Sequence, residues 1–251
     1  MVALGFLYLA EDSPLHDEVI SAQWFGRAAE KGDSEGMYEY GSCYLAGRGV
    51  EQDYSKAYSL FLKCYLKGNP KGNLGLARFY LDGEVVPCDI QTALRLLSTD
   101  VATQFPAAQA LKQNLIENLS EGMEKREVAA CVQLGWAVLN GYAGDGNRAL
   151  AYGLLTAAAV RQDPLARCLL RCYFSEQEQD CAADVEECRR YFRQLMEIGC
   201  SWAARELLLM ALRGDFEATE DEIQQLIGKG LELGDLTIRE LLIRQAAEAG
   251  E

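Results

Sequence analysis

Proline and histidine are scarce in this sequence of 251 residues. It has five prolines and a single histidine, whereas 49% of its residues are hydrophobic. This composition is typical of a packed helical protein and gives little sign of disordered linker. No apolar run approaches the ~20 residues that a membrane-spanning helix needs, so we expect no membrane insertion.

Basic charge is also in deficit. The chain has 24 Lys and Arg against 38 Asp and Glu, which gives a formal net charge of −14. Nucleic-acid-binding proteins usually carry a basic patch, and anionic membranes attract clustered lysine and arginine. We therefore expect no nucleic-acid partner. The acidic exterior is either an ordinary solvated surface or a face for a basic partner.

The groups that an enzyme would need are missing as well. The single histidine, His16, stands in the polar stretch EDSPLHDE without an evident catalytic partner. The sequence contains no P-loop, no dinucleotide-binding fingerprint and no G-x-S-x-G motif. The sequence therefore predicts neither enzyme activity nor a cofactor.

A period of about 36 residues runs through the chain. Thirty-six residues upstream, the residues Tyr44, Leu45, Asp53, Phe61 and Gly68 have counterparts at Tyr8, Leu9, Asp17, Phe25 and Gly32. Thirty-six residues downstream, the places of Tyr44, Leu45, Gly47, Asp53 and Ala57 are taken by Tyr80, Leu81, Gly83, Asp89 and Ala93. A fixed period of this size indicates stacked supersecondary units and not one globular core.

Each unit predicts a pair of helices. Small and apolar residues around Gly41 and Tyr44 recur at three- and four-residue steps, as on one face of a helix. Gly47 and Gly49 can take the positive φ that ends this helix, and Asp53 is placed to cap the next one. Since glycine costs a helix about 1 kcal/mol relative to alanine, Gly41 predicts a place where two helices cross closely.

The same positions recur in other units. The structural positions of the repeat are Gly5, Gly41, Tyr44, Gly47, Gly49, Asp53, Ala57, Gly68, Gly83, Asp89 and Gly135. The predicted caps of second helices are Asp17, Asp53, Asp89, Asp145 and Asp184, followed by a capping box from Thr219 to Glu222.

We expect one solenoid over residues 1–251 with about seven repeats. Its repeats are predicted at about 1–35, 36–71 and 72–106, then an irregular segment at 107–128, then 129–164, 165–201 and 202–235, with a capping helix at 236–249. The irregular segment offers a first helix but no second helix that ends in the usual glycine motif.

The stretches LGFLYL, WFGRAAEKGD and YGSCYLAGRGVEQDYSKAYSLF resemble the Sel-one-like repeat, a relative of the tetratricopeptide repeat. The resemblance is specific over residues 1–105 and weaker over 129–235. It implies an all-α, right-handed α/α superhelix that acts as a protein-interaction scaffold, commonly an adaptor in bacterial signalling, secretion or envelope processes.

The nine cysteines cannot all pair within one chain, because their number is odd. Cys64 takes the place that Ala28 has in the preceding repeat, which is typical of a small buried residue. We therefore expect reduced thiols and a cytoplasmic protein, or a periplasmic one if a signal peptide was removed. The cluster Cys168, Cys172, Cys181 and Cys188 has spacings that fit structural zinc poorly, so no metal is predicted.

A binding site is expected on the first helices of the repeats. One position of each first helix faces away from the Tyr44 stripe, and these positions are Phe6, Ser42, Arg78, Gln113, Trp136, Arg171 and Leu209. Arg and Trp are enriched at binding hot spots, whereas the alternative is that these are ordinary packing or solvated positions.

We therefore expect a non-enzymatic scaffold that binds a protein or peptide in a concave groove. A bacterial immunity protein that neutralises a secreted toxin is the alternative within the binding class. An enzyme or a metal-dependent protein is the alternative from another class. The sequence identifies neither the partner nor the oligomeric state.

Overall fold

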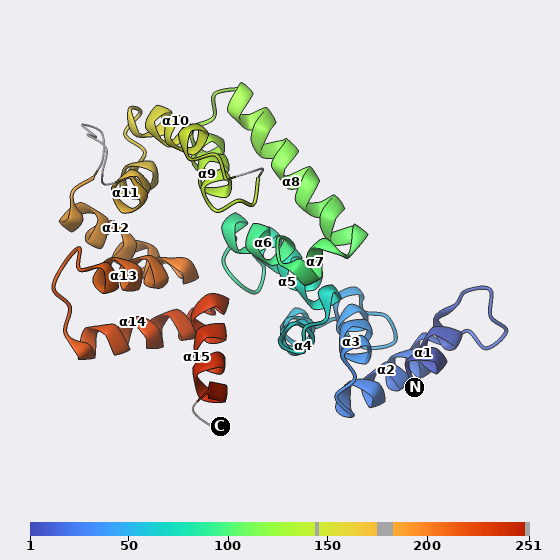
Figure 1. The fold of residues 1–251 in the computed structure, drawn as a ribbon. Coiled ribbons are helices and arrows are strands. Elements are labelled where there is room, and N and C mark those ends of the chain that lie inside the picture. Colours follow the sequence, from blue (N-terminus) through green and yellow to red (C-terminus); the bar gives the residue numbers. More distant parts are fainter. Residues whose placement is uncertain (144–145, 175–182, 249–251) are drawn as a thin grey trace. The chain divides into compact units, whose positions relative to one another are not determined.

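The structure is a computed structural model that describes residues 1–143, 146–174 and 183–248. All regular secondary structure in these ranges is helical, and no strand occurs in them (Figure 1). The predicted all-α class is confirmed. The chain divides into two compact units, unit 1 (Met1–Leu115) and unit 2 (Ile116–Glu251), whereas the sequence predicts one array over residues 1–251.

Unit 1 contains three helix pairs. They are α1 (Val2–Leu9) with α2 (Glu18–Glu30), α3 (Ser34–Ala46) with α4 (Tyr54–Leu66), and α5 (Pro70–Asp82) with α6 (Ile90–Leu97), followed by the short α7 (Asp100–Thr103). We call the first helix of each pair its A helix and the second its B helix. From α1 to α6 each helix packs against its neighbours in the chain, and the A helices α3 and α5 also touch.

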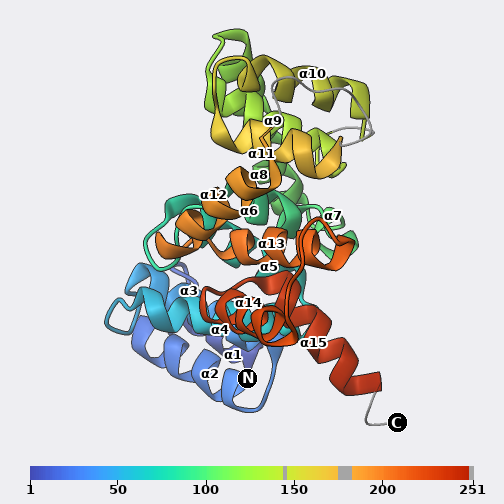
Figure 2. The same cartoon turned by 90° about the vertical axis from the view of Figure 1, so that its left-hand side faces the viewer.

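Unit 2 repeats this arrangement with three further pairs. They are α9 (Val128–Leu139) with α10 (Arg148–Ala159), α11 (Pro164–Tyr173) with α12 (Val185–Glu197), and α13 (Ser201–Arg213) with α14 (Glu220–Glu232), followed by α15 (Leu236–Glu248). Figure 2 shows these pairs stacked one after another from α9 to α14.

The boundary between the units falls within α8 (Pro106–Glu124), the helix of the irregular segment. As expected, this segment supplies one helix and no second helix before α9 begins. None of the closely packed helix pairs includes α8. A missing B helix leaves α8 without the partner that every other A helix of the two units has, and the division of the chain follows from that.

Side-chain caps fix where the B helices begin. The carboxylate oxygen of Asp17 accepts from Ile20 N (3.0 Å), that of Asp53 from Lys56 N (2.9 Å), that of Asp89 from Thr92 N (3.0 Å) and that of Asp184 from Glu187 N (2.7 Å). Thr219 and Glu222 form the predicted capping box. Asp145 lies outside the described residues, and Asn147 caps α10 by accepting from Leu150 N at 3.1 Å.

The glycine motif that ends a B helix also starts the next A helix. Gly68 takes a φ of 74° after α4, and the next residue, Asn69, accepts from Lys71 N at 3.0 Å at the start of α5. Asp33 does the same for α3. One dipeptide therefore ends one helix and caps the next, so successive helices are joined by short, fixed turns.

The predicted close crossing of A and B helices is present in unit 1. An ideal Cβ on Gly41 would lie 2.8 Å from the ring of Phe61, and one on Gly5 would lie 2.5 Å from the ring of Phe25. Both rings are fully buried. The glycine leaves room for the aromatic ring of the B helix, and a side chain at that position would displace it.

Candidate functional site

The predicted binding residues divide between the two units. Phe6, Ser42, Arg78 and Gln113 lie in unit 1, whereas Trp136, Arg171 and Leu209 lie in unit 2. Phe6 is 40% exposed and Leu209 is 38% exposed; Arg78, Gln113 and Arg171 are exposed, and Ser42 is half-buried. Whether these residues bind a partner is a prediction that the geometry alone does not test.

Trp136 requires a correction. Its side chain is only 2% exposed and packs edge-to-face on Trp202 of α13, with the ring centroids 4.7 Å apart. Trp202 in turn packs on Phe192. Because burying a large aromatic ring stabilises the fold, Trp136 serves the core of unit 2 and does not present its ring to a partner.

A polar cluster covers the A helices of unit 1. We define the α3–α5 patch as Tyr38, Glu39, Ser42, Lys71 and Arg78. The Lys71 ammonium lies 5.2 Å from the centroid of the Tyr38 ring, and the Ser42 hydroxyl donates to the carbonyl of Tyr38 at 3.0 Å. The patch therefore joins residues of two successive repeats on one surface.

Ion pairs hold the centre of the α3–α5 patch in place. The Lys71 ammonium contacts the carboxylates of Glu35 and, at 3.3 Å, of Glu39. Burial raises the pKa of Glu39, although Lys71 opposes the shift. Burial disfavours the charged form of Lys71, but the hydrogen bonds and negative charges of Glu35 and Glu39 together outweigh burial and raise the pKa of the ammonium. The charge of Lys71 is therefore already matched within the protein.

Arg78, the other cation of the α3–α5 patch, differs from Lys71 in its surroundings. Burial raises the pKa of Tyr38, and the positive charge of Arg78 acts against that shift, so the two groups lie near each other. The Arg78 side chain is exposed, and in the described ranges no carboxylate forms an ion pair with it. Of the two cations in the α3–α5 patch, Arg78 is thus the one free to meet an anion from outside.

Sequence reasoning missed a buried polar network in unit 2. The Tyr173 hydroxyl donates to the Glu206 carboxylate at 2.9 Å, and the Arg205 guanidinium lies 3.7 Å from Glu206 and 3.2 Å from Asp235. Glu206 is 1% exposed, and burial raises its pKa against the charge of Arg205. One acidic residue within the apolar run of SWAARELLLMALR was the available signal. The network joins α11, α13 and the start of α15.

The cysteines and the histidine show no catalytic arrangement. Within residues 1–143, 146–174 and 183–248, no group of three or more His, Cys, Asp or Glu could hold a metal ion. Cys168, Cys172 and Cys188 are buried, and a hydrogen bond with Cys168 raises the pKa of Cys188 to about 12. Such thiols are poor nucleophiles. Cys181 lies outside the described residues, and His16 is exposed.

No helix in the described ranges is both long enough and apolar enough to cross a membrane.

A family model, the Sel1 repeat, matches four segments of the chain. The matched residues are 1–33, 34–69, 70–99 and 128–159, which together make up just over half of the chain. The first three segments contain the three helix pairs of unit 1, and the fourth contains α9 and α10 of unit 2.

Curated proteins match shorter parts of the chain. The ERAD-associated E3 ubiquitin-protein ligase components HRD3B and HRD3A of Arabidopsis thaliana are 28% and 26% identical over 114 residues, which is 44% of this chain. The DAP3-binding cell death enhancer 1 of Rattus norvegicus is 37% identical over 70 residues, or 28% of this chain. The matched parts are 18%, 16% and 13% of the lengths of these relatives.

Two solved structures align along most of the chain with low TM-scores. A protective antigen of uropathogenic Escherichia coli with an SLR fold has a TM-score of 0.40 at 22% identity, and covers 94% of this chain and 62% of its own. A Sel1 repeat protein from Oxalobacter formigenes has a TM-score of 0.39 at 17% identity, and covers 92% and 86%.

Proposed function

This chain belongs to the Sel1 repeat family, and on that premise we propose that it is a non-enzymatic scaffold that holds a partner protein on its A helices. Sel1 repeats generally mediate protein–protein interactions, and proteins of the family are typically non-enzymatic. The proposed contact surface is the α3–α5 patch, extended along α1 by Phe6. The partner is a protein or a peptide segment.

The exposed guanidinium of Arg78 is the observation that carries this proposal. It lies beside Tyr38, and Lys71, which stacks on the same ring, already has its own carboxylates. Arginine binds carboxylates through two parallel hydrogen bonds, and Arg and Tyr are both enriched at binding hot spots. The patch thus suits a segment that carries Asp, Glu or a free C-terminal carboxylate.

Phe6 supplies an apolar contact beside this polar surface. Its ring packs edge-to-face on the buried Phe25 with centroids 5.2 Å apart, and 40% of the residue remains exposed. A ring held in this way loses little freedom when a partner covers it, which favours binding. In unit 2, the exposed Arg171 offers the same chemistry as Arg78. Gln113 in unit 1 and Leu209 in unit 2 remain predicted contacts.

What is known of the relatives agrees with a role in protein assembly. Two are described as components of a ubiquitin ligase and one as binding the protein DAP3. An immunity role against a secreted toxin, the alternative from the sequence, has no structural observation of its own. Co-purification of the chain with a toxin would be the finding in its favour.

The test begins with capture of the partner by the tagged full chain from a lysate of the native organism, followed by mass spectrometry. The affinity of the purified partner is then compared among the wild-type chain, Arg78→Ala and Arg27→Ala. Arg27 is an exposed arginine on the B helix α2 and serves as the matched control. We expect Arg78→Ala to weaken binding by more than about 1–2 kcal/mol, the scale of a hot spot.

Arg27→Ala should bind as the wild-type chain does, and both variants should keep their helical circular dichroism. If Arg78→Ala, Arg171→Ala and Phe6→Ala all bind normally while charge reversal of exposed acidic residues abolishes the complex, the proposal for the A helices is wrong.

A further inference from the structure

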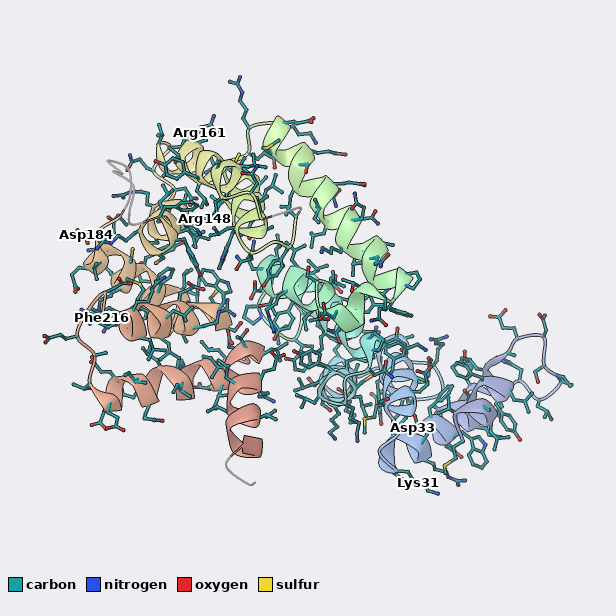
Figure 3. The ribbon with its side chains drawn as sticks, in the orientation of Figure 1. Lys31, Asp33, Arg148, Arg161, Asp184 and Phe216 are labelled. Atoms are coloured by element: carbon teal, nitrogen blue, oxygen red, sulfur yellow. The ribbon has the colours of Figure 1, made fainter. Side chains whose placement is uncertain are left out.

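A cavity of about 470 Å³ lies in unit 2 between the B helices α12 and α14. Leu207 of the A helix α13 and Phe216 of the loop between α13 and α14 also line it, and Figure 3 labels Phe216. This volume lies within the range of about 300–1,000 Å³ that is typical of ligand pockets. None of the predicted site residues lines it.

The loop that carries Phe216 differs from its counterpart in unit 1. In unit 1, the loop from Gly47 to Asp53 packs Val50 against the core residues of the second and third helices, and the backbone at Gly49 lies directly against α2. The loop from Gly214 to Thr219 is one residue shorter, and its single large apolar residue, Phe216, is half-buried and lines the cavity.

The interior of the cavity is apolar. Leu207 is 2% exposed, and Met196 of α12 and Leu226 of α14 are half-buried. The Phe216 ring is held from the outside by the Arg189 guanidinium, which lies 4.3 Å from the ring centroid. A large apolar side chain from a partner would be removed from water on several sides in this space, which favours its binding.

The charged groups around the cavity are mostly matched within the protein. Lys229 pairs with Glu232 at 3.1 Å, and Arg189 pairs with Glu186 at 2.6 Å. Glu222 accepts from the backbone N–H of Thr219 in the capping box, at the positive end of α14. These groups hold the walls and have little charge left for a ligand.

The remaining charges at the rim are predominantly negative. The rim carboxylates, which are exposed and have no partner in the described ranges, are Glu197, which lines the cavity, and Glu217, Glu220 and Asp221, which stand directly after Phe216 in the loop and the first turn of α14. Arg193, which lines the cavity, and Arg190, one turn before it on α12, are the corresponding unpaired cations. Four carboxylates against two guanidinium groups leave the surroundings of the cavity net negative, which favours a basic ligand.

We propose that this acidic-rimmed cavity is a second docking site, which takes a basic peptide segment that inserts one large apolar side chain. The apolar residue fills the space above Leu207, and flanking Lys or Arg residues meet the carboxylates of the rim. The α3–α5 patch suits an acidic segment, so the two sites select opposite charges. The second site stands whether or not the patch binds a partner.

Three fluorescein-labelled peptides test the recognition directly by anisotropy with the full chain. The first has a central Phe flanked by Lys, the second has Ala in place of Phe, and the third has Glu in place of Lys. We expect the first to bind at least about tenfold more tightly than either of the others, and its affinity to fall several-fold when salt is raised from about 0.05 M to about 0.5 M. Equal binding of the Lys and Glu peptides would overturn the proposal, as would no binding of the first.

Two tryptophan variants at neighbouring positions test whether the peptide occupies the cavity. Gln225 lines the cavity, whereas its neighbour Gln224 is exposed and does not. Gln225→Trp should fill the opening and weaken the first peptide at least about tenfold, and Gln224→Trp should leave binding unchanged. If both variants bind equally well, the peptide does not occupy the cavity.

Two sets of charge-removing substitutions test whether the peptide responds to the rim carboxylates or to the net charge of the protein. The rim variant combines Glu217→Gln, Glu220→Gln and Asp221→Asn, and the control combines Glu11→Gln, Asp12→Asn and Glu51→Gln at exposed positions of unit 1. Both remove the same net charge. The rim variant should weaken the first peptide several-fold and the control should not. Equal losses would show that the peptide responds to net charge only.

Discussion

Unit 1 and unit 2 form the same helix pairs but pack them differently. In unit 1 the glycine of an A helix lies directly against a buried phenylalanine of the B helix, as Gly41 does against Phe61. In unit 2 the corresponding Gly135 faces Leu155, and an added Cβ would lie 3.2 Å from that side chain. In both units the A and B helices therefore meet closely at a glycine of the A helix. The contact is tighter where the B helix presents an aromatic ring.

The two units also differ in what a buried carboxylate connects. In unit 1 the buried carboxylate of Asp89 caps its own helix α6, whereas in unit 2 that of Glu206 joins the A helices α11 and α13. A cavity lies between the B helices α12 and α14 of unit 2. The comparison indicates that departures from the repeat are places to look for function.

Gly41→Leu should produce the largest loss of stability. An ideal Cβ at this position already lies 2.8 Å from the Phe61 ring, so a leucine must displace a fully buried aromatic. We expect the free energy of unfolding to fall by about 3 kcal/mol or more, measured by urea unfolding followed by far-ultraviolet circular dichroism.

Ser42→Leu is the matched control, one position further round the same helix. Ser42 is half-buried, and its hydroxyl donates to the carbonyl of Tyr38 in its own helix. Loss of this hydrogen bond should lower the free energy of unfolding by about 1 kcal/mol or less. Equal losses at the two positions would contradict the packing described for unit 1.

Glu206→Gln tests the buried charge of unit 2 through its dependence on pH. Burial raises the pKa of Glu206 above its ordinary value of 4.5, so the folded state binds the proton more tightly than the unfolded state. The contribution of Glu206 to stability is therefore greatest below pH 4.5 and decreases as the pH rises through the raised pKa. The variant lacks this decrease.

The stability of Glu206→Gln relative to the wild-type chain should thus increase with pH, by about 1.4 kcal/mol for each unit of the pKa shift. Urea unfolding from about pH 5 to about pH 8 measures this difference. A constant difference for Glu206→Gln would mean that its carboxylate is not buried.

Gly153→Ala should give the smallest effect, and in the opposite direction to Gly41→Leu. Gly153 is exposed in the B helix α10, and an added Cβ would meet no atom within 4 Å. Alanine favours the helix over glycine, so the free energy of unfolding should rise by about 0.5–1 kcal/mol in the same urea assay. A loss of stability would show that this glycine has a packing role.

Most of the fold was predictable because its signals are local and repeated. Asp53 caps a helix that begins at the next residue, and Gly41 packs against the next helix in the chain. Because such residues recur with a fixed period, the sequence shows which helices form pairs. The site was less predictable, since a helix turns a side chain by a large angle at each residue. Trp136 shares the register of Arg78, yet its ring packs on Trp202, two A helices further on.

The cavity and the Glu206 network were not predictable from the period at all. They depend on contacts among residues far apart in sequence, such as those of Tyr173 with Glu206 and of Arg205 with Asp235. A repeat pattern describes what the units share, whereas these features arise where the units differ.

Hydrogen–deuterium exchange of the full chain, with and without its captured partner, tests the central claim most directly. If the partner binds the A helices of unit 1, amide exchange should slow in α3 (Ser34–Ala46) and α5 (Pro70–Asp82) and stay unchanged in the B helix α4 (Tyr54–Leu66). Slowed exchange confined to α12 (Val185–Glu197) and α14 (Glu220–Glu232), with α3 and α5 unchanged, would contradict the claim and make the unit 2 cavity the surface that the partner uses.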